Sequence, residues 1–121
     1  MIRKSYYWKN VTEKMLKQLD FRYSNGFSTE DDKAFIKYVP LYTYSETIIL
    51  EARIVAYLDG TVKVDVMDAC FHSYYAAWYI EETEERYPFL KEVNVKLSKI
   101  LKRYGIKEIV EKNGSKDKKV K

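Results

Sequence analysis

The strongest constraint on the fold is an alternation of apolar and polar residues on both sides of a short turn at residues 58–60. Within residues 47–57 every even position is apolar, and the same holds within residues 61–67. A period of two residues is typical of a β-strand that buries one face. The sequence therefore predicts a β-hairpin made of these two segments.

The length of the turn follows from matching the two apolar faces. A two-residue loop at Asp59 and Gly60 would place these faces on opposite sides of the sheet. A three-residue loop that includes Leu58 places them on the same side, with Gly60 in the left-handed position of a G1 bulge. The same register sets Arg53 opposite Asp65, so we expect a cross-strand ion pair between them.

Most of the remaining chain is predicted to be helical, with one further strand. The spacing of apolar residues favours helices near 10–19, 29–38, 73–86 and 88–104 and a short strand near 41–44. Two segments keep an alternative: residues 34–39 also alternate as a strand does, and residues 106–110 fit either a strand or a helical turn. The expected fold class is α+β, a β-hairpin or small antiparallel sheet (strands near 41–44, 47–57 and 61–67) packed against about four helices.

Local signals set the expected helix ends. Asn10 followed by Glu13 resembles a capping box at the start of the first helix. Pro88 is expected to end the helix before it, and Gly105 is a good C-terminal cap for the last helix.

The basic character of the chain belongs to its last ten residues. Residues 112–121 hold five of the 22 basic and one of the 18 acidic side chains, so residues 1–111 hold 17 of each and sum to zero. We expect one globular domain over residues 1–111 and a disordered basic tail over 112–121. A neutral body lowers the expectation that the domain is a general nucleic-acid binder.

Composition also indicates a compartment. A single cysteine suits a reducing environment, and no apolar run reaches the length of a membrane span. The expectation is a cytoplasmic protein with no membrane partner. No glycine-rich phosphate loop, serine elbow or HExxH motif is present, so no cofactor and no catalytic residue are predicted.

Two groups of residues would suit a catalytic or metal-binding site, although neither forms a complete motif. Cys70 and His72 lie two residues apart, a spacing that rarely supplies a nucleophile–base pair, and a zinc site would need two further ligands. Hairpin carboxylates with Lys63 would suit a metal-dependent hydrolase or nuclease, although the usual Glu-x-Lys is not there. We interpret both groups as structural and keep a hydrolase as the second alternative. The carboxylates concerned are Glu51, Asp59, Asp65 and Asp68.

The 19 aromatic residues, 12 of them tyrosine, are the feature most suggestive of binding. Tyrosine is favoured at protein interfaces. With its lysines and its lack of catalytic motifs, the chain resembles accessory proteins from viruses or mobile elements. The leading hypothesis is a non-enzymatic interaction module that acts through protein–protein contacts and self-associates. Its expected binding surface comprises Tyr42, Tyr44, Arg53, Tyr57, Lys63 and Asp65.

The alternative is nucleic-acid binding of the winged-helix type, because predicted helices precede a long hairpin. A basic helix face and the tail would then contact phosphates. The residues expected to do so are Lys96, Lys99, Lys102 and Arg103 in the helix and Lys116, Lys118 and Lys119 in the tail.

Overall fold

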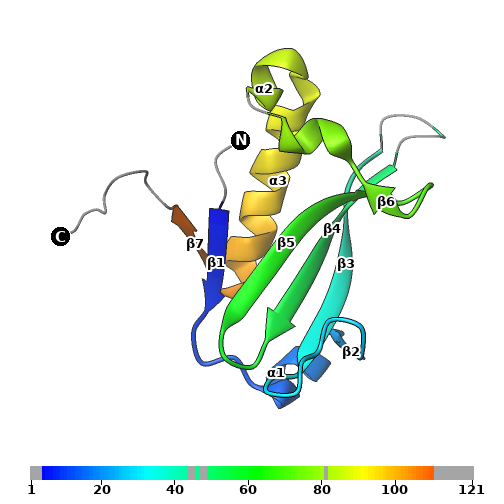
Figure 1. Cartoon of the computed structure of the whole chain (residues 1–121). Helices are drawn as coiled ribbons and strands as arrows, with labels where there is room; N and C mark the ends of the chain where they lie inside the picture. The colour runs from blue at the N-terminus through cyan, green and yellow to red at the C-terminus, as the bar shows by residue number, and fades with distance from the viewer. Residues whose placement is uncertain (1–3, 44–45, 47–48, 81, 111–121) are drawn as a thin grey trace.

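A single antiparallel sheet dominates the molecule (Figure 1). The computed structural model describes residues 4–43, 46, 49–80 and 82–110. Its strands are β1 (Lys4–Trp8), β2 (Arg22–Ser24), β3 (Ala34–Thr43), β4 (Ile49–Tyr57), β5 (Thr61–Asp68), β6 (Ser73–Tyr74) and β7 (Ile106–Val110). They lie in the order β2-β3-β4-β5-β1-β7, and β6 adds to β5 beyond the point where β1 leaves it.

Helices form a smaller part of the fold than the sequence suggested. The described helices are α1 (Glu13–Gln18), the 3-10 turn η1 (Ala76–Tyr79), α2 (Thr83–Arg86) and α3 (Phe89–Tyr104). Among these, α3 alone is longer than six residues. The prediction of about four helices packed on a small sheet is therefore wrong: seven strands in one sheet make this a sheet-dominated fold.

The hairpin itself is confirmed. Ala56 lies opposite Val62 and Arg53 opposite Asp65, which is the register of a three-residue loop. Gly60 has φ of 100°, and its N–H donates to the carbonyl of Tyr57 at 3.0 Å. Glycine adopts a positive φ at little cost, so this residue closes the loop.

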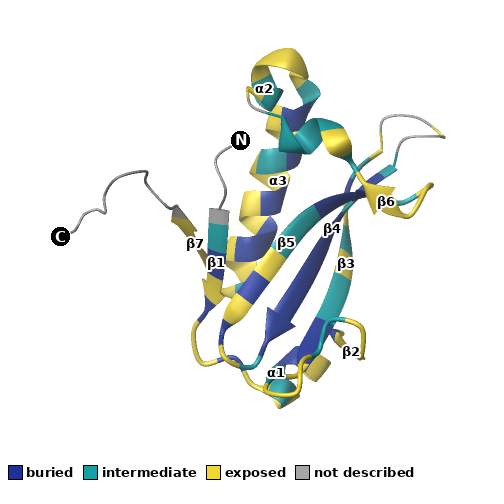
Figure 2. Cartoon of the chain, viewed as in Figure 1, coloured by how far each residue is buried: buried dark blue, intermediate teal, exposed yellow. Residues whose placement is uncertain are grey.

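The predicted helix near 88–104 is also confirmed, as α3, with Gly105 at its C-terminal cap at φ of 89°. Its apolar stripe packs on the face of the sheet that carries the even-numbered residues of β4 and β5. Figure 2 shows in dark blue the buried residues along α3 and along the strands. The buried residues of the helix are Leu90, Val93, Leu97, Ile100 and Leu101.

The segment near 29–38 is not a helix: residues 29–33 belong to the loop between β2 and β3, and residue 34 begins a strand. Residues 34–43 form β3, which lies between β2 and β4 and includes residues 41–43 of the strand expected near 41–44, whose last residue lies outside the described part of the chain. The register shifts between Pro40 and Tyr42, because proline has no N–H to give to the ladder. Pairing with a long neighbouring strand outweighed the helical spacing of Ala34 and Phe35.

The N-terminal helix is shorter than expected and is preceded by a strand. Trp8 belongs to β1, where it lies opposite Ile106 of β7. Asn10 has φ of 61° and lies in the turn after β1, so it is not the cap. Thr12 caps α1 instead, because its hydroxyl oxygen accepts the N–H of Met15 at 3.1 Å.

The predicted helix at 73–86 is replaced by three short elements. Ser73 and Tyr74 pair with the end of β5 as β6, then η1 and α2 follow. No residue of these three elements is buried, although several are half-buried. The aromatic spacing in this segment therefore does not mark the apolar stripe of a helix.

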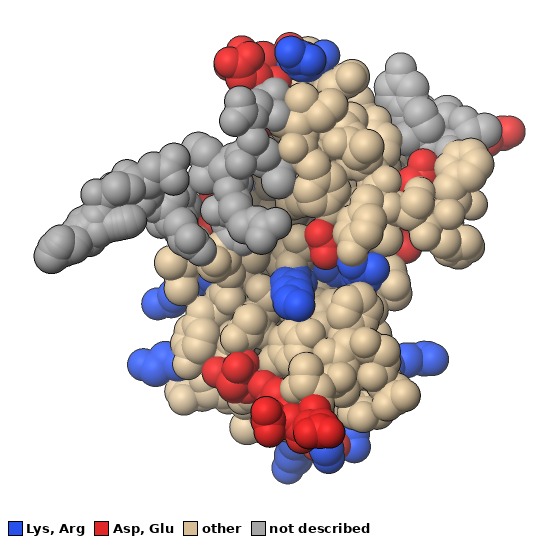
Figure 3. Space-filling model, viewed as in Figure 1, with Lys and Arg blue, Asp and Glu red and all other residues tan. Residues whose placement is uncertain are grey.

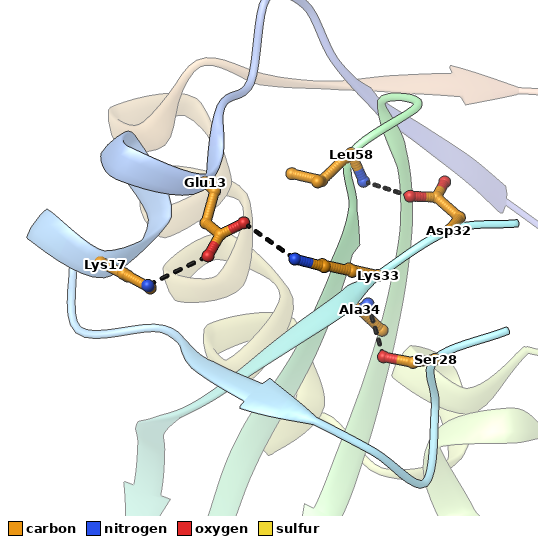
Figure 4. Close-up of polar contacts among 7 residues, drawn as sticks. All are labelled: Glu13, Lys17, Ser28, Asp32, Lys33, Ala34 and Leu58. Atoms are coloured by element: carbon orange, nitrogen blue, oxygen red, sulfur yellow. Dashed lines mark hydrogen bonds and ion pairs between the residues drawn. The ribbon is translucent and has the colours of Figure 1, made fainter. Parts of the chain in front are cut away.

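The loop between β2 and β3 covers part of the sheet face opposite α3. The phenol of Tyr57 donates to the carbonyl of Phe27 at 2.9 Å, and Asp32 accepts the N–H groups of Leu58 and Asp59 at 3.1 and 3.2 Å. Figure 4 shows Asp32 reaching Leu58, with the Lys33–Glu13 ion pair beside it. Hydrogen bonds therefore connect this loop to the hairpin turn at one end of the sheet.

Candidate binding groove

A groove of about 1120 Å³ opens where β1 separates from β5. β1 pairs with β5 at Val62 and Thr61, and β6 pairs with it at Met67 and Asp68. Between these two sites, residues 63–66 have no described strand partner on that edge. Figure 1 shows β1 and β5 diverging toward the end of the molecule that carries α2.

Residues from both sides of this gap line the groove. β1 and β5 form one wall, and η1, α2 and the first half of α3 form the other. The lining residues are Ser5, Tyr6, Thr61, Val62, Lys63, Val64, Asp65, Trp78, Tyr79, Ile80, Glu82, Thr83, Glu84, Glu85, Lys91 and Asn94.

The backbone of Val64 faces the gap. The carbonyl of Gly60 accepts the N–H of Trp8 at 2.9 Å, and the carbonyl of Val66 accepts the N–H of Tyr75 at 3.0 Å. Because alternate residues of a strand direct their backbone groups to the same side, the N–H and C=O of Val64 point to this edge as well. Val64 therefore offers one donor and one acceptor to an added strand.

Side-chain hydrogen bonds position the wall opposite β5. The indole N–H of Trp78 donates to the amide oxygen of Asn94 at 2.8 Å, and the Asn94 amide donates to Glu84. The hydroxyl of Thr83 donates to the carbonyl of Ala77. These bonds attach η1 and α2 to α3 in a segment that has no fully buried side chain.

A second set of polar contacts attaches η1 and β6 to the sheet. The phenol of Tyr79 donates to Asp65 at 2.6 Å, and Arg53 binds the other oxygen of the same carboxylate at 3.2 Å. Arg53 also donates to the hydroxyl of Tyr74 at 2.8 Å. Burial, followed by the bond to Asp65, raises the pKa of Tyr79 well above its usual value, so the phenol stays neutral.

Arg53 is the buried charge at the centre of these contacts. It is 8% exposed, and its guanidinium lies 4.9 Å from the centroid of the Phe27 ring and 5.0 Å from that of Tyr74. Its Nε is buried without a hydrogen-bond partner among the described atoms. Arg53 therefore joins the loop, the sheet and β6, and it is not an open binding residue.

The structure separates the residues expected to form one binding surface. Lys63 and Asp65 line the groove, whereas Arg53 and Tyr57 are buried. Tyr42 is half-buried and stacks on Phe89 of α3 at 5.4 Å, and Tyr44 lies outside the described residues.

The basic residues expected to contact nucleic acid fall into two groups. The four from the helix lie exposed on α3, and the three from the tail lie outside the described residues. They are Lys96, Lys99, Lys102 and Arg103 in α3 and Lys116, Lys118 and Lys119 in the tail.

The weak catalytic constellations are dispersed. Asp68 accepts the N–H groups of Cys70 and Phe71, and the thiol of Cys70 contacts the carbonyl of Glu46. Cys70 and His72 are both exposed. No group of three or more histidine, cysteine, aspartate or glutamate side chains placed to hold a metal was found among the described residues.

Sequence reasoning missed most of the groove. Trp78, Glu84 and Asn94 were read as positions on regular helices, and no pattern joins residues 78 and 94. The one indication in the sequence was the aromatic run at residues 74–79, which suggested protein binding but did not place these residues in a particular site.

No protein-family model matches this chain, and neither a curated protein nor a solved structure does. No relative therefore assigns a role to any residue, and the charges, contacts and burial of the groove alone bear on what it binds. No helix among the described residues is both long and apolar enough to cross a membrane.

Proposed function

We propose that this chain is a non-enzymatic interaction module that binds an extended, positively charged segment of a partner polypeptide in the groove beside β5. The observation that carries the proposal is the interrupted edge of β5, where Val64 directs its N–H and C=O into the groove. An extended peptide that adds to a sheet edge gains main-chain hydrogen bonds there and places alternate side chains against the walls.

The charge of the groove favours a basic partner. Four carboxylates (Asp65, Glu82, Glu84 and Glu85) and two amines (Lys63 and Lys91) line it, and Arg53 forms an ion pair with Asp65, so the three glutamates carry the acidic character. Figure 3 shows acidic side chains, with basic ones beside them, at the end of the molecule that carries α2. Charge complementarity steers association and excludes partners of like charge.

The aromatic wall supplies the apolar part of the contact. Trp78 and Tyr79 pack edge to face, with ring centroids 4.8 Å apart, and both are half-buried. Each aromatic ring gives a large contact area at low cost in side-chain entropy, so aromatic residues dominate many interfaces. Alternate apolar side chains of an added strand would lie against these rings.

Fluorescence anisotropy with labelled ten-residue peptides tests this function. A peptide of alternating lysine and valine is expected to bind saturably, and its glutamate–valine counterpart is not. A lysine–valine peptide that is N-methylated at every second residue keeps its charge but loses its strand hydrogen bonds, so it is expected to bind much more weakly. Equal binding of the methylated and unmethylated peptides would contradict strand addition.

A pair of variants tests the location. Glu82→Gln with Glu85→Gln removes two groove charges, and we expect it to weaken binding. Glu30→Gln with Asp31→Asn removes two exposed charges from the β2–β3 loop and serves as the matched control. A similar loss in both variants would show that net charge, not the groove, determines binding.

The winged-helix alternative has lost its structural support. The helix expected near 29–38 is not formed, since residues 34–38 belong to strand β3, and α3 follows the hairpin and does not precede it. The expectation of self-association stays a prediction, which light scattering on the eluting peak of a size-exclusion column will test.

A further inference from the structure

The outward side of α3 concentrates positive charge. Residues 95–103 contain four basic side chains and no acidic one. All four are exposed. We call this set, Lys96, Lys99, Lys102 and Arg103, the basic ridge. Because residues 1–111 sum to zero, the rest of that range carries a net charge of −4, so the charge of the body is segregated.

The ridge is unfavourable for the isolated helix. Lys99 is three residues from Lys96 and from Lys102 and four from Arg103, and like charges at these spacings repel on a helix. No ion pair to any of the four is found among the described residues. Lys102 and Arg103 gain from the negative end of the helix dipole, and Lys96 has Glu92 four residues before it at a favourable spacing, whereas Lys99 has neither.

The spacing of the ridge fits a chain of phosphates. At a rise of about 1.5 Å per residue, Lys96 and Arg103 lie roughly 10 Å apart along the helix axis. Along the axis of a duplex, where each strand rises roughly 3.4 Å per base step, that span corresponds to about three base steps. We propose that the basic ridge binds the phosphate backbone of nucleic acid without reading its sequence.

This site is separate from the groove. The groove uses Lys91 and Asn94 from the first half of α3, whereas the ridge lies on the second half. The inference therefore does not depend on the peptide-binding proposal, and either can fail alone.

The test is anisotropy of a labelled 20-base-pair duplex with the full-length chain, from 50 to 200 mM salt. Lys96→Gln with Lys99→Gln is expected to weaken binding by roughly tenfold for each lysine at the lower salt. The slope of the logarithm of the binding constant against the logarithm of salt concentration should become shallower by about two, because two phosphate contacts are lost. Lys116→Gln with Lys118→Gln removes the same charge from the tail and serves as the control. Its duplex binding is expected to depend on salt as steeply as that of the unchanged chain.

A charge reversal separates binding from folding. Lys99→Glu places an acid four residues before Arg103, a favourable spacing, so we expect an unchanged or higher Tm together with weaker duplex binding. Three results would overturn the proposal: duplex binding by the double ridge variant equal to that of the unchanged chain, loss of all binding in the tail variant, or competition by polyglutamate as strong as that by unlabelled duplex.

Discussion

The hairpin of β4 and β5 with α3, and the segment at residues 73–86, are stabilised in different ways. The hairpin and α3 bury continuous apolar faces, with Leu50, Ile54 and Leu90 fully inaccessible to solvent. The segment buries no residue of β6, η1 or α2 completely and is attached through tyrosine, asparagine, threonine and arginine side chains. The difference indicates that the groove has a rigid part, formed by β5 and α3, and a weaker wall, formed by η1 and α2.

The largest expected effect lies in the rigid part. Leu90→Ala removes a fully buried side chain from α3 and should cost about 2–5 kcal/mol of unfolding free energy, because a cavity is left behind. Ile80→Ala, in the weaker wall, removes a half-buried side chain and should cost less than about 1 kcal/mol. Urea unfolding of both variants measures the contrast. Equal costs would remove the distinction between the rigid part and the weaker wall.

The contact between the two regions comes next. Arg53→Met keeps the length of the side chain but removes the bonds to Asp65 and Tyr74, so we expect a loss of about 1.5–3 kcal/mol. Because these bonds attach β6, amide exchange at residues 73–79 should accelerate more than in α3. A loss below about 0.5 kcal/mol would show that the buried charge does not stabilise the fold.

The hairpin turn provides a smaller effect. A Cβ at Gly60 would lie 2.3 Å from the ring of Tyr7, and φ of 100° is unfavourable for other residues. Gly60→Ala should cost about 1–2 kcal/mol from backbone strain, plus the displacement of Tyr7. In a Tyr7→Ala background, Gly60→Ala should lose only the free energy that comes from backbone strain. An equal loss of unfolding free energy in both backgrounds would mean that the Tyr7 ring moves aside at no cost.

The smallest effect concerns the weaker wall. Tyr79→Phe removes the bond to Asp65 and should cost about 1 kcal/mol at neutral pH. The raised pKa of Tyr79 means that the unfolded chain ionises first as the pH passes about 10, so the stabilisation present below that pH is lost above it. The Tm should therefore decline less steeply from pH 8 to 11 in Tyr79→Phe than in the unchanged chain. Tyr87→Phe, at an exposed position, is the control, and its Tm should follow that of the unchanged chain.

The sequence predicted the elements whose own residues determine them. The alternation at residues 47–67 specified the strands, the bulged loop and the Arg53–Asp65 pair, because a slip of one residue would turn an apolar face to water. The apolar stripe of α3 and its cap at Gly105 were found for the same reason: local spacing and burial agree there.

The errors lie where distant partners decide the conformation. Trp8 has helical spacing to Val11, but pairing with Ile106 of β7, near the other end of the chain, makes it part of a strand. β3 depends on β4 in the same way. The groove was missed because the contacts that place its aromatic side chains, Tyr79 with Asp65 and Trp78 with Asn94, join residues 14 and 16 positions apart.

The most direct test of the account is hydrogen exchange at the amide of Val64, measured by NMR with and without the lysine–valine peptide. In the free protein this amide should exchange faster than that of Val62, which pairs with Tyr6 of β1, because no described strand lies opposite Val64. On saturation with peptide it should slow by at least tenfold, while the amides of α3 stay unchanged. A Val64 amide already as protected as that of Val62, or one that the bound peptide does not slow, would contradict strand addition in the groove.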